Sequence, residues 1–145
     1  MQLDVRGPRF AATVTTVVLI VVLVTASGPL LAAQAVVFAI GAANARLAPY
    51  GLFFRRFVAP RLGPPREFEP AAPVRFAQGV GVAFALVGAI GYLAGAPVVG
   101  AVASGLALAA AFLNAAFGLC VGCEVYLVLR RLTARRATGA IARTE

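Results

Sequence analysis

The sequence of 145 residues contains no histidine, lysine or tryptophan, and it has only two cysteines and five acidic residues. Without histidine or lysine, the chain cannot form a Ser-His-Asp or Cys-His nucleophilic system, a lysine Schiff base or a histidine metal site. It also has no glycine-rich phosphate loop of the required pattern. Two cysteines do not make the disulfide framework of a small secreted protein. These absences exclude most of the usual catalytic machinery.

Charged residues are also scarce. They make up 12% of the chain, whereas 61% of the residues are hydrophobic. An ordinary soluble domain is about 25% charged and roughly 45–50% apolar. A soluble chain of this length could not cover so much apolar surface with polar residues. The composition therefore predicts an integral membrane protein whose surroundings are the lipid bilayer.

Four long uncharged segments have the length and hydrophobicity of membrane-spanning helices. They cover residues 10–26, 30–45, 76–94 and 97–117. About 17–25 residues cross the hydrocarbon, so the second segment is at the lower limit. The first is not followed by a signal-peptide cleavage site, and we expect it to be retained. The sequence predicts an all-α fold: a four-helix transmembrane bundle built from two helical hairpins, in a single membrane domain.

The two predicted hairpins resemble each other weakly. Arg9-Phe10 opens the first segment as Arg75-Phe76 opens the third, and prolines occupy both short turns. A duplicated hairpin would form parallel repeats, as in one class of transporters. Compositional bias explains the similarity as well as duplication does, and the sequence does not decide between the two.

All 13 basic residues are arginines, and none lies in either short turn. They lie before the first segment, in the loop 46–75 and after the fourth segment, so they flank hydrophobic runs instead of forming a nucleic-acid groove. The positive-inside rule places both termini and this loop in the cytoplasm. We therefore expect a multi-pass protein of a bacterial inner (plasma) membrane that binds no nucleic acid.

Short interfacial helices are expected after the second and the fourth segments. Within the cytoplasmic loop, residues 50–58 mix aromatic side chains with arginines, which is typical of a helix lying at the membrane surface. A second interfacial segment is predicted over 119–132 and a flexible tail over 133–145. Small residues in the third and fourth segments favour close helix packing and are compatible with a homodimer.

Cys120 and Cys123 are separated by two residues and form a CxxC pair. Positions i and i+3 share one face of a helix, so both sulfurs could meet one partner, and Gly118 and Gly122 would let it approach. Three interpretations stay open: a redox or sulfur-handling thiol pair, two small buried hydrophobes, and metal binding. A structural zinc site needs four ligands, which one chain does not supply, so no metal and no cofactor is expected.

Glu124 and four amides are the other candidate site residues. Glu124 follows the CxxC pair near the cytoplasmic surface, where it would pair with an arginine of the central loop or handle protons beside the thiols. The amides would hydrogen-bond between helices or line a substrate path. They are Gln34, Asn44, Gln78 and Asn114.

Several stretches resemble an uncharacterised family of bacterial integral membrane proteins, the domain of unknown function 4395. They are residues 5–10, 33–38, 49–56, 75–78 and 113–124. The most specific is the run Asn-Ala-Ala-Phe-Gly-Leu-Cys-Val-Gly-Cys-Glu that ends at Glu124. The resemblance covers residues 3 to 132 and implies an integral membrane protein with no assigned activity. The plan is also similar, by loose analogy, to small membrane partners of thioredoxin-like and sulfurtransferase proteins.

Three functions are compatible with the sequence. The first is a thiol-redox or sulfur-relay protein in which Cys120 and Cys123 exchange with a cytoplasmic thioredoxin-like or sulfurtransferase protein. The second is a small transporter or channel subunit that uses the four amides as its polar lining. The third is a scaffold without chemistry of its own. The sequence does not decide whether the protein is an enzyme.

Overall fold

The computed structural model describes residues 2–143 and is almost entirely helical, which confirms the predicted all-α class apart from one short ribbon. The elements, in chain order, are β1 (Gln2–Asp4), α1 (Arg6–Thr25), α2 (Gly28–Ala43), α3 (Pro49–Phe53), the π-helical turn η1 (Phe54–Val58), α4 (Ala59–Leu62), β2 (Phe68–Pro70), α5 (Ala71–Leu93), α6 (Pro97–Phe117) and α7 (Val121–Ala142).

Among residues 2–143, three helices are long and apolar enough to cross a bilayer. These are α1, α5 and α6, with 20, 23 and 21 residues. At a rise of 1.5 Å per residue each reaches about 30 Å, which is the thickness of the hydrocarbon core. Helix α2 is also apolar but has 16 residues. The structure therefore supports a membrane protein with three candidate spanning helices.

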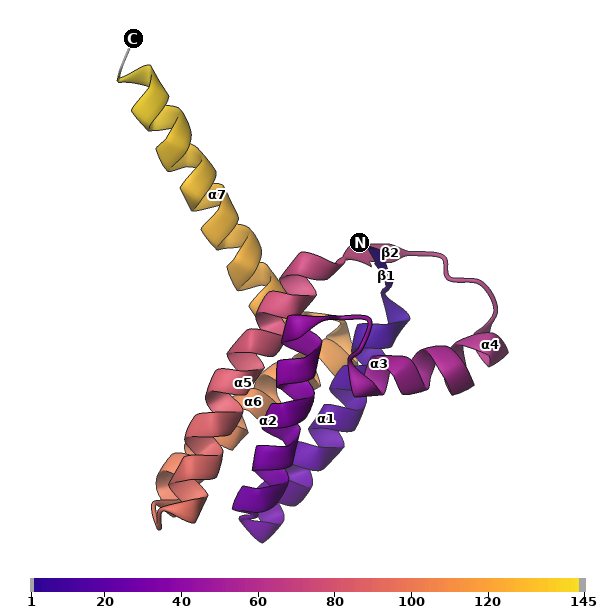
Figure 1. The fold of residues 1–145 in the computed structure, drawn as a ribbon, viewed down its shortest axis with the longest axis vertical. Helices are drawn as coiled ribbons and strands as arrows, with labels where there is room; N and C mark the ends of the chain where they lie inside the picture. Colours follow the sequence, from indigo (N-terminus) through magenta and orange to yellow (C-terminus); the bar gives the residue numbers. More distant parts are fainter. Residues whose placement is uncertain (1, 144–145) are drawn as a thin grey trace.

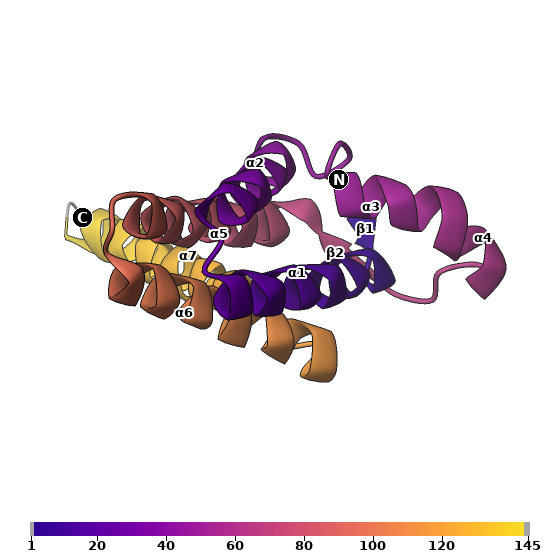
Figure 2. The same ribbon diagram turned by 90° about the horizontal axis from the view of Figure 1, so that it is seen from below.

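Helices α1, α2, α5 and α6 lie side by side in two layers, α2 with α5 and α1 with α6 (Figures 1 and 2). Helices α5 and α6 also pack closely against each other, whereas α1 and α2 touch much less although a short turn joins them. Each helix of the first predicted hairpin thus packs mainly on a helix of the second pair. The centre of the bundle holds fully buried apolar side chains, including Leu19, Val22, Leu31 and Ala85.

Small residues allow α5 and α6 to approach. A Cβ atom added at Gly91 would lie 2.8 Å from the backbone nitrogen of Gly100, and one added at Gly100 would lie 2.6 Å from the ring of Tyr92. No side chain fits at such distances without moving one helix. Where the surroundings are as apolar as the helix surface, close van der Waals contact of this kind drives helix association.

The arginines gather at one end of the bundle. The two short turns, at residues 26–27 and 94–96, lie at the opposite end (Figure 1). The described arginines lie at the end that carries the ribbon and the loop 46–70, or on α7, which projects from it. We call this the arginine end.

A two-stranded ribbon joins the starts of two helices. Strand β1 pairs antiparallel with β2, and Leu3 faces Glu69 in the register. Each strand directly precedes a helix, so the pairing brings the first turns of α1 and α5 together. The Arg6 guanidinium donates to the Asp4 carboxylate at 2.8 Å, and this hydrogen bond holds the pKa of Asp4 below its usual range.

Elements α3, η1 and α4 form one continuous helical segment that runs across the axis of the bundle beside α1 (Figure 1). Phe10 of α1 holds it, because its ring stacks on Phe53 at a centroid distance of 5.9 Å and lies 5.6 Å from Phe54. Phe54 is buried, whereas Phe53 and Phe57 are about half exposed. A helix does follow the second apolar segment, as predicted.

Several predicted boundaries need correction. Helix α5 begins at Ala71, five residues before the expected start, because Pro73 is tolerated in a first helical turn. The expected flexible tail is wrong for residues 133–142, which continue α7, since they are rich in good helix formers. Helix α7 leaves the bundle instead of lying across its end, and none of its residues is buried (Figure 1). Residues 144–145 lie outside the described part.

Candidate functional site

The two cysteines form a disulfide, with 5.2 Å between their Cα atoms. The sequence predicts that both cysteines share one face of a helix. In the structure they lie at the junction between α6 and α7, with Cys120 before the first residue of α7. Helix α6 ends at Gly118, which has a φ of 68° and donates its N–H to the Asn114 carbonyl at 3.0 Å. A glycine suits this left-handed cap because it has no Cβ atom. Cys120 then adopts an extended conformation and starts α7.

Cys120 caps α7 through its sulfur. The Cys123 N–H donates to the Cys120 Sγ at 3.3 Å, in the place where a serine oxygen usually accepts. The start of a helix carries a partial positive charge, which favours an anion over a neutral group. In a reduced chain, a Cys120 thiolate would accept the same N–H at the positive end of the helix.

Glu124 lies in the first turn of α7 and is exposed. Among residues 2–143 the ion pair is that of Arg6 with Asp4, so the expected pairing of Glu124 with an arginine of the central loop is not formed. The positive end of α7 provides the favourable field instead, because Glu124 is within one turn of it.

Both cysteines line a cavity of about 450 Å³ between α1, α5, α6 and the start of α7. We call it the disulfide cavity. Polar side chains in it include Arg9, Glu69, Gln78 and Asn114. Phe38, Phe84 and Leu106 line it farther along the helices, away from the arginine end. The structure thus brings four of the predicted site residues together, namely Cys120, Cys123, Gln78 and Asn114.

Arg9 is a member of this site that the sequence did not reveal. Its guanidinium lies against Gly118, where an added Cβ atom would be 3.7 Å from Nε and 3.8 Å from Cζ. Arg9 and Cys120 line the same cavity. The only sequence signal for it is the Arg-Phe pair at residues 9–10, which recurs at residues 75–76 and is interpreted as part of the weak internal repeat.

Glu69 is the second residue that sequence analysis missed. It lies on β2, is half-buried and lines the disulfide cavity. Burial raises the pKa of its carboxyl group, because the charged form loses water. Because its pKa is raised, Glu69 keeps its proton to a higher pH than an exposed carboxyl would.

The raised pKa of Glu69 predicts a pH-dependent stability. The carboxyl holds its proton more tightly in the folded chain than in the unfolded chain. Its contribution to the free energy of unfolding is therefore complete below the ordinary glutamate pKa of about 4.3, and it is lost as pH rises through the raised pKa. The melting temperature of the wild type, relative to Glu69→Gln, should therefore fall as pH rises from about 4 upward. Glu67→Gln, which removes an exposed carboxylate from the same loop, is the matched control. A difference in melting temperature between the wild type and Glu69→Gln that does not change with pH would contradict the raised pKa of Glu69.

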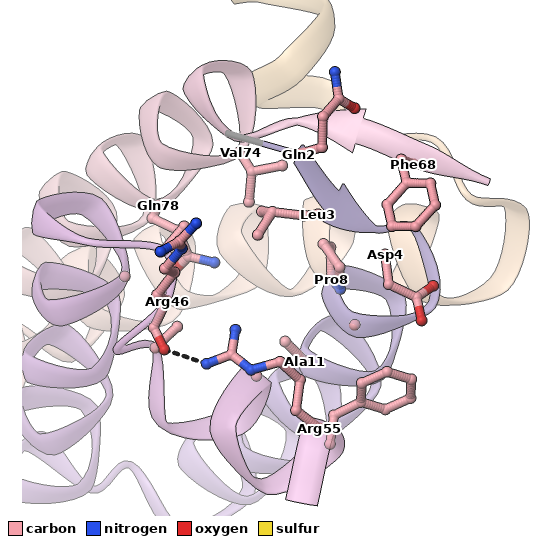
Figure 3. A pocket seen from close by; sticks show the side chains of 16 residues that line it. Gln2, Leu3, Asp4, Pro8, Ala11, Arg46, Arg55, Phe68, Val74 and Gln78 are labelled. Atoms are coloured by element: carbon pink, nitrogen blue, oxygen red, sulfur yellow. Dashed lines mark hydrogen bonds between the residues drawn. The ribbon is translucent and has the colours of Figure 1, made fainter. Parts of the chain in front are cut away.

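A second cavity, of about 410 Å³, lies beside the first at the arginine end (Figure 3). Arg46, Arg55, Gln2 and Gln78 are among its polar lining residues. Gln78 and three apolar residues line both cavities, so the two are adjacent. We call this one the arginine cavity.

The sequence model described as "Domain of unknown function (DUF4395)" matches residues 3–131. The chain belongs to this family. The match confirms the resemblance read from the sequence, and it includes the CxxC pair, Arg9 and Glu69. In comparisons with curated proteins and with solved structures, nothing matches the chain.

The remaining polar candidates of the DUF4395 chain lie outside both cavities. Gln34 is buried in α2, and its Oε1 accepts a hydrogen bond from the Tyr50 hydroxyl at 2.7 Å. Asn44 ends α2 and is exposed, and its Oδ1 accepts the N–H of Arg46 at 3.0 Å. These two amides hold the chain in place where it leaves α2.

Metal binding finds no support in the described part of this DUF4395 protein. Within residues 2–143, no three cysteine, histidine, aspartate or glutamate side chains lie close enough to hold one ion. The arrangement around the cysteines instead combines a reducible bond, a nearby cation, a protonatable carboxyl and an open cavity.

Proposed function

We propose that this DUF4395 protein is a membrane-bound thiol–disulfide exchange protein. One observation carries the proposal: the Cys120–Cys123 disulfide caps the start of α7 and faces a cavity of about 450 Å³. Both cysteines are only partly buried, so a partner thiol can reach them. The partner would be a cytoplasmic thioredoxin-like or sulfurtransferase protein with a reactive thiol of its own.

The exchange involves two substitutions at sulfur. A thiolate of the partner attacks the Cys120 sulfur, the bond between Cys120 and Cys123 breaks, and Cys123 leaves with the electron pair and takes up a proton. A second thiolate of the partner then attacks the partner sulfur that is bonded to Cys120. The mixed disulfide breaks, and Cys120 leaves as a thiolate. The partner is oxidised by two electrons and the CxxC pair is reduced. The Cys123 N–H and Arg9 stabilise the departing Cys120 thiolate.

We further propose that four helices cross a bacterial inner membrane, with the arginine end in the cytoplasm. Helix α2 is about 24 Å long at 1.5 Å per residue, which is shorter than the hydrocarbon core of about 30 Å. It nevertheless packs along the spanning helix α5, so it would lie in the same apolar surroundings as α5. The uncharged turns lie at the opposite end, which fits the positive-inside rule. The segment α3–α4 would lie at the membrane surface, with its exposed phenylalanines toward lipid.

Thiol labelling tests the exchange. Isolated membranes are treated with an alkylating mass tag before and after reduction, and we expect two tags per chain only after reduction. The reduced protein should then be reoxidised by a disulfide-bonded thioredoxin-like protein, with a matching gain of thiols in that protein. The proposal would be contradicted if no reductant reduced the disulfide, or if the reduced pair exchanged with the partner no faster than a free thiol does. Substrate flux that survives Cys120→Ser with Cys123→Ser would favour a transporter subunit instead.

A further inference from the structure

The arginine cavity holds two cations that converge from different parts of the chain. Arg46 lies in the turn after α2, and Arg55 lies in η1. Figure 3 shows both side chains extending into the same space, with the Gln78 amide beside Arg46. The tertiary fold therefore places two guanidinium groups and an amide around one opening.

These cations have no acidic partner among residues 2–143. The carboxylate that also lines the cavity belongs to Asp4, and Arg6 already engages it through Nε at 3.1 Å and Nη2 at 2.8 Å. Asp4 thus shares the cavity with Arg46 and Arg55, but its carboxylate oxygens are held by Arg6. Two like charges in one concavity repel each other, and an anion between them would remove that cost.

The backbone holds the two arginines in position. Arg55 donates from Nη2 to the carbonyl of Arg46, the contact drawn as a dashed line in Figure 3. The N–H of Arg46 is in turn held by Asn44 Oδ1 at 3.0 Å. Since a guanidinium has five N–H donors in a planar fork, the remaining donors can bind an oxyanion in a bidentate manner.

We propose that the arginine cavity binds a phosphate group, carried by an anionic phospholipid or by a free phosphate ion. Planar guanidinium forks match the geometry of phosphate oxygens, and the Gln78 amide can add a neutral donor. The volume of about 410 Å³ lies within the roughly 300–1,000 Å³ that small-ligand sites occupy. This site is independent of the thiol chemistry proposed above.

The surroundings favour the lipid as the source of the phosphate. Phe53 and Phe57, which flank Arg55 on the same helical segment, are 52% and 53% exposed, and Leu52 is 45% exposed. An apolar face beside a cationic cavity fits a molecule with an anionic head and acyl chains. A free phosphate ion would use the cavity and leave this face uncovered.

Lipid retention tests the site. The full chain is purified, stripped of lipid and titrated with phosphatidylglycerol in detergent, and bound lipid is counted by native mass spectrometry. We expect Arg46→Gln with Arg55→Gln to weaken retention about tenfold or more, because two charge-assisted contacts are lost. The matched control is Arg56→Gln with Arg61→Gln, which removes two charges from the same loop but no lining residue. We expect a change of less than about twofold there.

Two results would overturn the proposal: equal weakening in both double variants, or none in either. Inorganic phosphate added in competition separates the two sources. If phosphate displaces the lipid and this competition also depends on Arg46 and Arg55, the site binds a phosphate group from either source. If phosphate does not displace the lipid, the site requires the whole lipid molecule. Should the glutamine variant fail to fold, Arg46→Lys with Arg55→Lys keeps both charges but loses the planar forks. Unchanged retention in that variant would also reject the site.

Discussion

Replacing Cys123 by serine is expected to trap the protein in a stable mixed disulfide through Cys120, whereas replacing Cys120 should prevent the adduct from forming. The asymmetry follows from the capping geometry. Cys120 Sγ accepts the Cys123 N–H at 3.3 Å at the start of a helix and shares a cavity with Arg9, so we expect its thiolate to be the stabilised one. Without Cys123, nothing in the chain can resolve the adduct, because the chain has two cysteines.

The measurement is adduct formation by reduced, purified variants with a small aromatic disulfide, followed by intact mass. At about pH 6, where an ordinary thiol with a pKa of about 8.5 is almost fully protonated, Cys120→Ser should react at least roughly tenfold more slowly than Cys123→Ser. The double variant sets the background. Equal rates would mean that the capping position does not activate Cys120. A faster Cys120→Ser variant would make Cys123 the attacking residue.

Replacing Gly122 by alanine is expected to displace α7 from the bundle. The added Cβ atom would lie 2.6 Å from the Cβ and 2.7 Å from the Cα of Ala77 on α5, and backbone cannot yield as a flexible side chain can. Overpacking of this kind costs about 1–3 kcal/mol, which exceeds the roughly 1 kcal/mol that alanine contributes over glycine within a helix. Because Gly122 lies between the two cysteines, exchange should slow as well.

Gly139→Ala is the matched control, since Gly139 lies on the same helix with no atom within 4 Å of an added Cβ. There alanine should leave the melting temperature unchanged or raise it, through helix propensity alone. Thermal unfolding in detergent and the rate of thiol exchange are compared for both variants. Similar melting temperatures for the two would show that α7 does not pack on α5 at Gly122.

Local signals were enough to predict the helices. The fourth segment was predicted over residues 97–117, and α6 covers Pro97–Phe117. Proline at its start and Gly118 after its end mark both boundaries directly. The starts of α1 and α5 were placed too late, at 10 and 76 instead of Arg6 and Ala71, because arginine and proline ended the apolar runs. A helix can continue past a hydrophobic run, and only its backbone hydrogen bonds mark its end.

The cavity partners of the cysteines could not be predicted in this way. Glu69 was read as a loop residue, because nothing near it in the sequence indicates that β2 pairs with residues 2–4. Strands of three residues are too short to carry an alternating pattern. The same holds for Arg46 and Arg55: in the sequence they indicate only membrane topology, and the fold brings them to one cavity.

The sequence by itself determined that this protein belongs in a membrane, that its four apolar segments are helical, and that Cys120 and Cys123 are its one thiol pair. Hydrophobicity, turn residues and the CxxC spacing are local properties, and they need no knowledge of the fold. Only the tertiary structure decided that α1 packs on α6 and that Arg9 and Glu69 join the cysteines at one cavity. Contacts between residues so far apart in the chain depend on how small side chains let the helices approach, and no local pattern encodes that geometry.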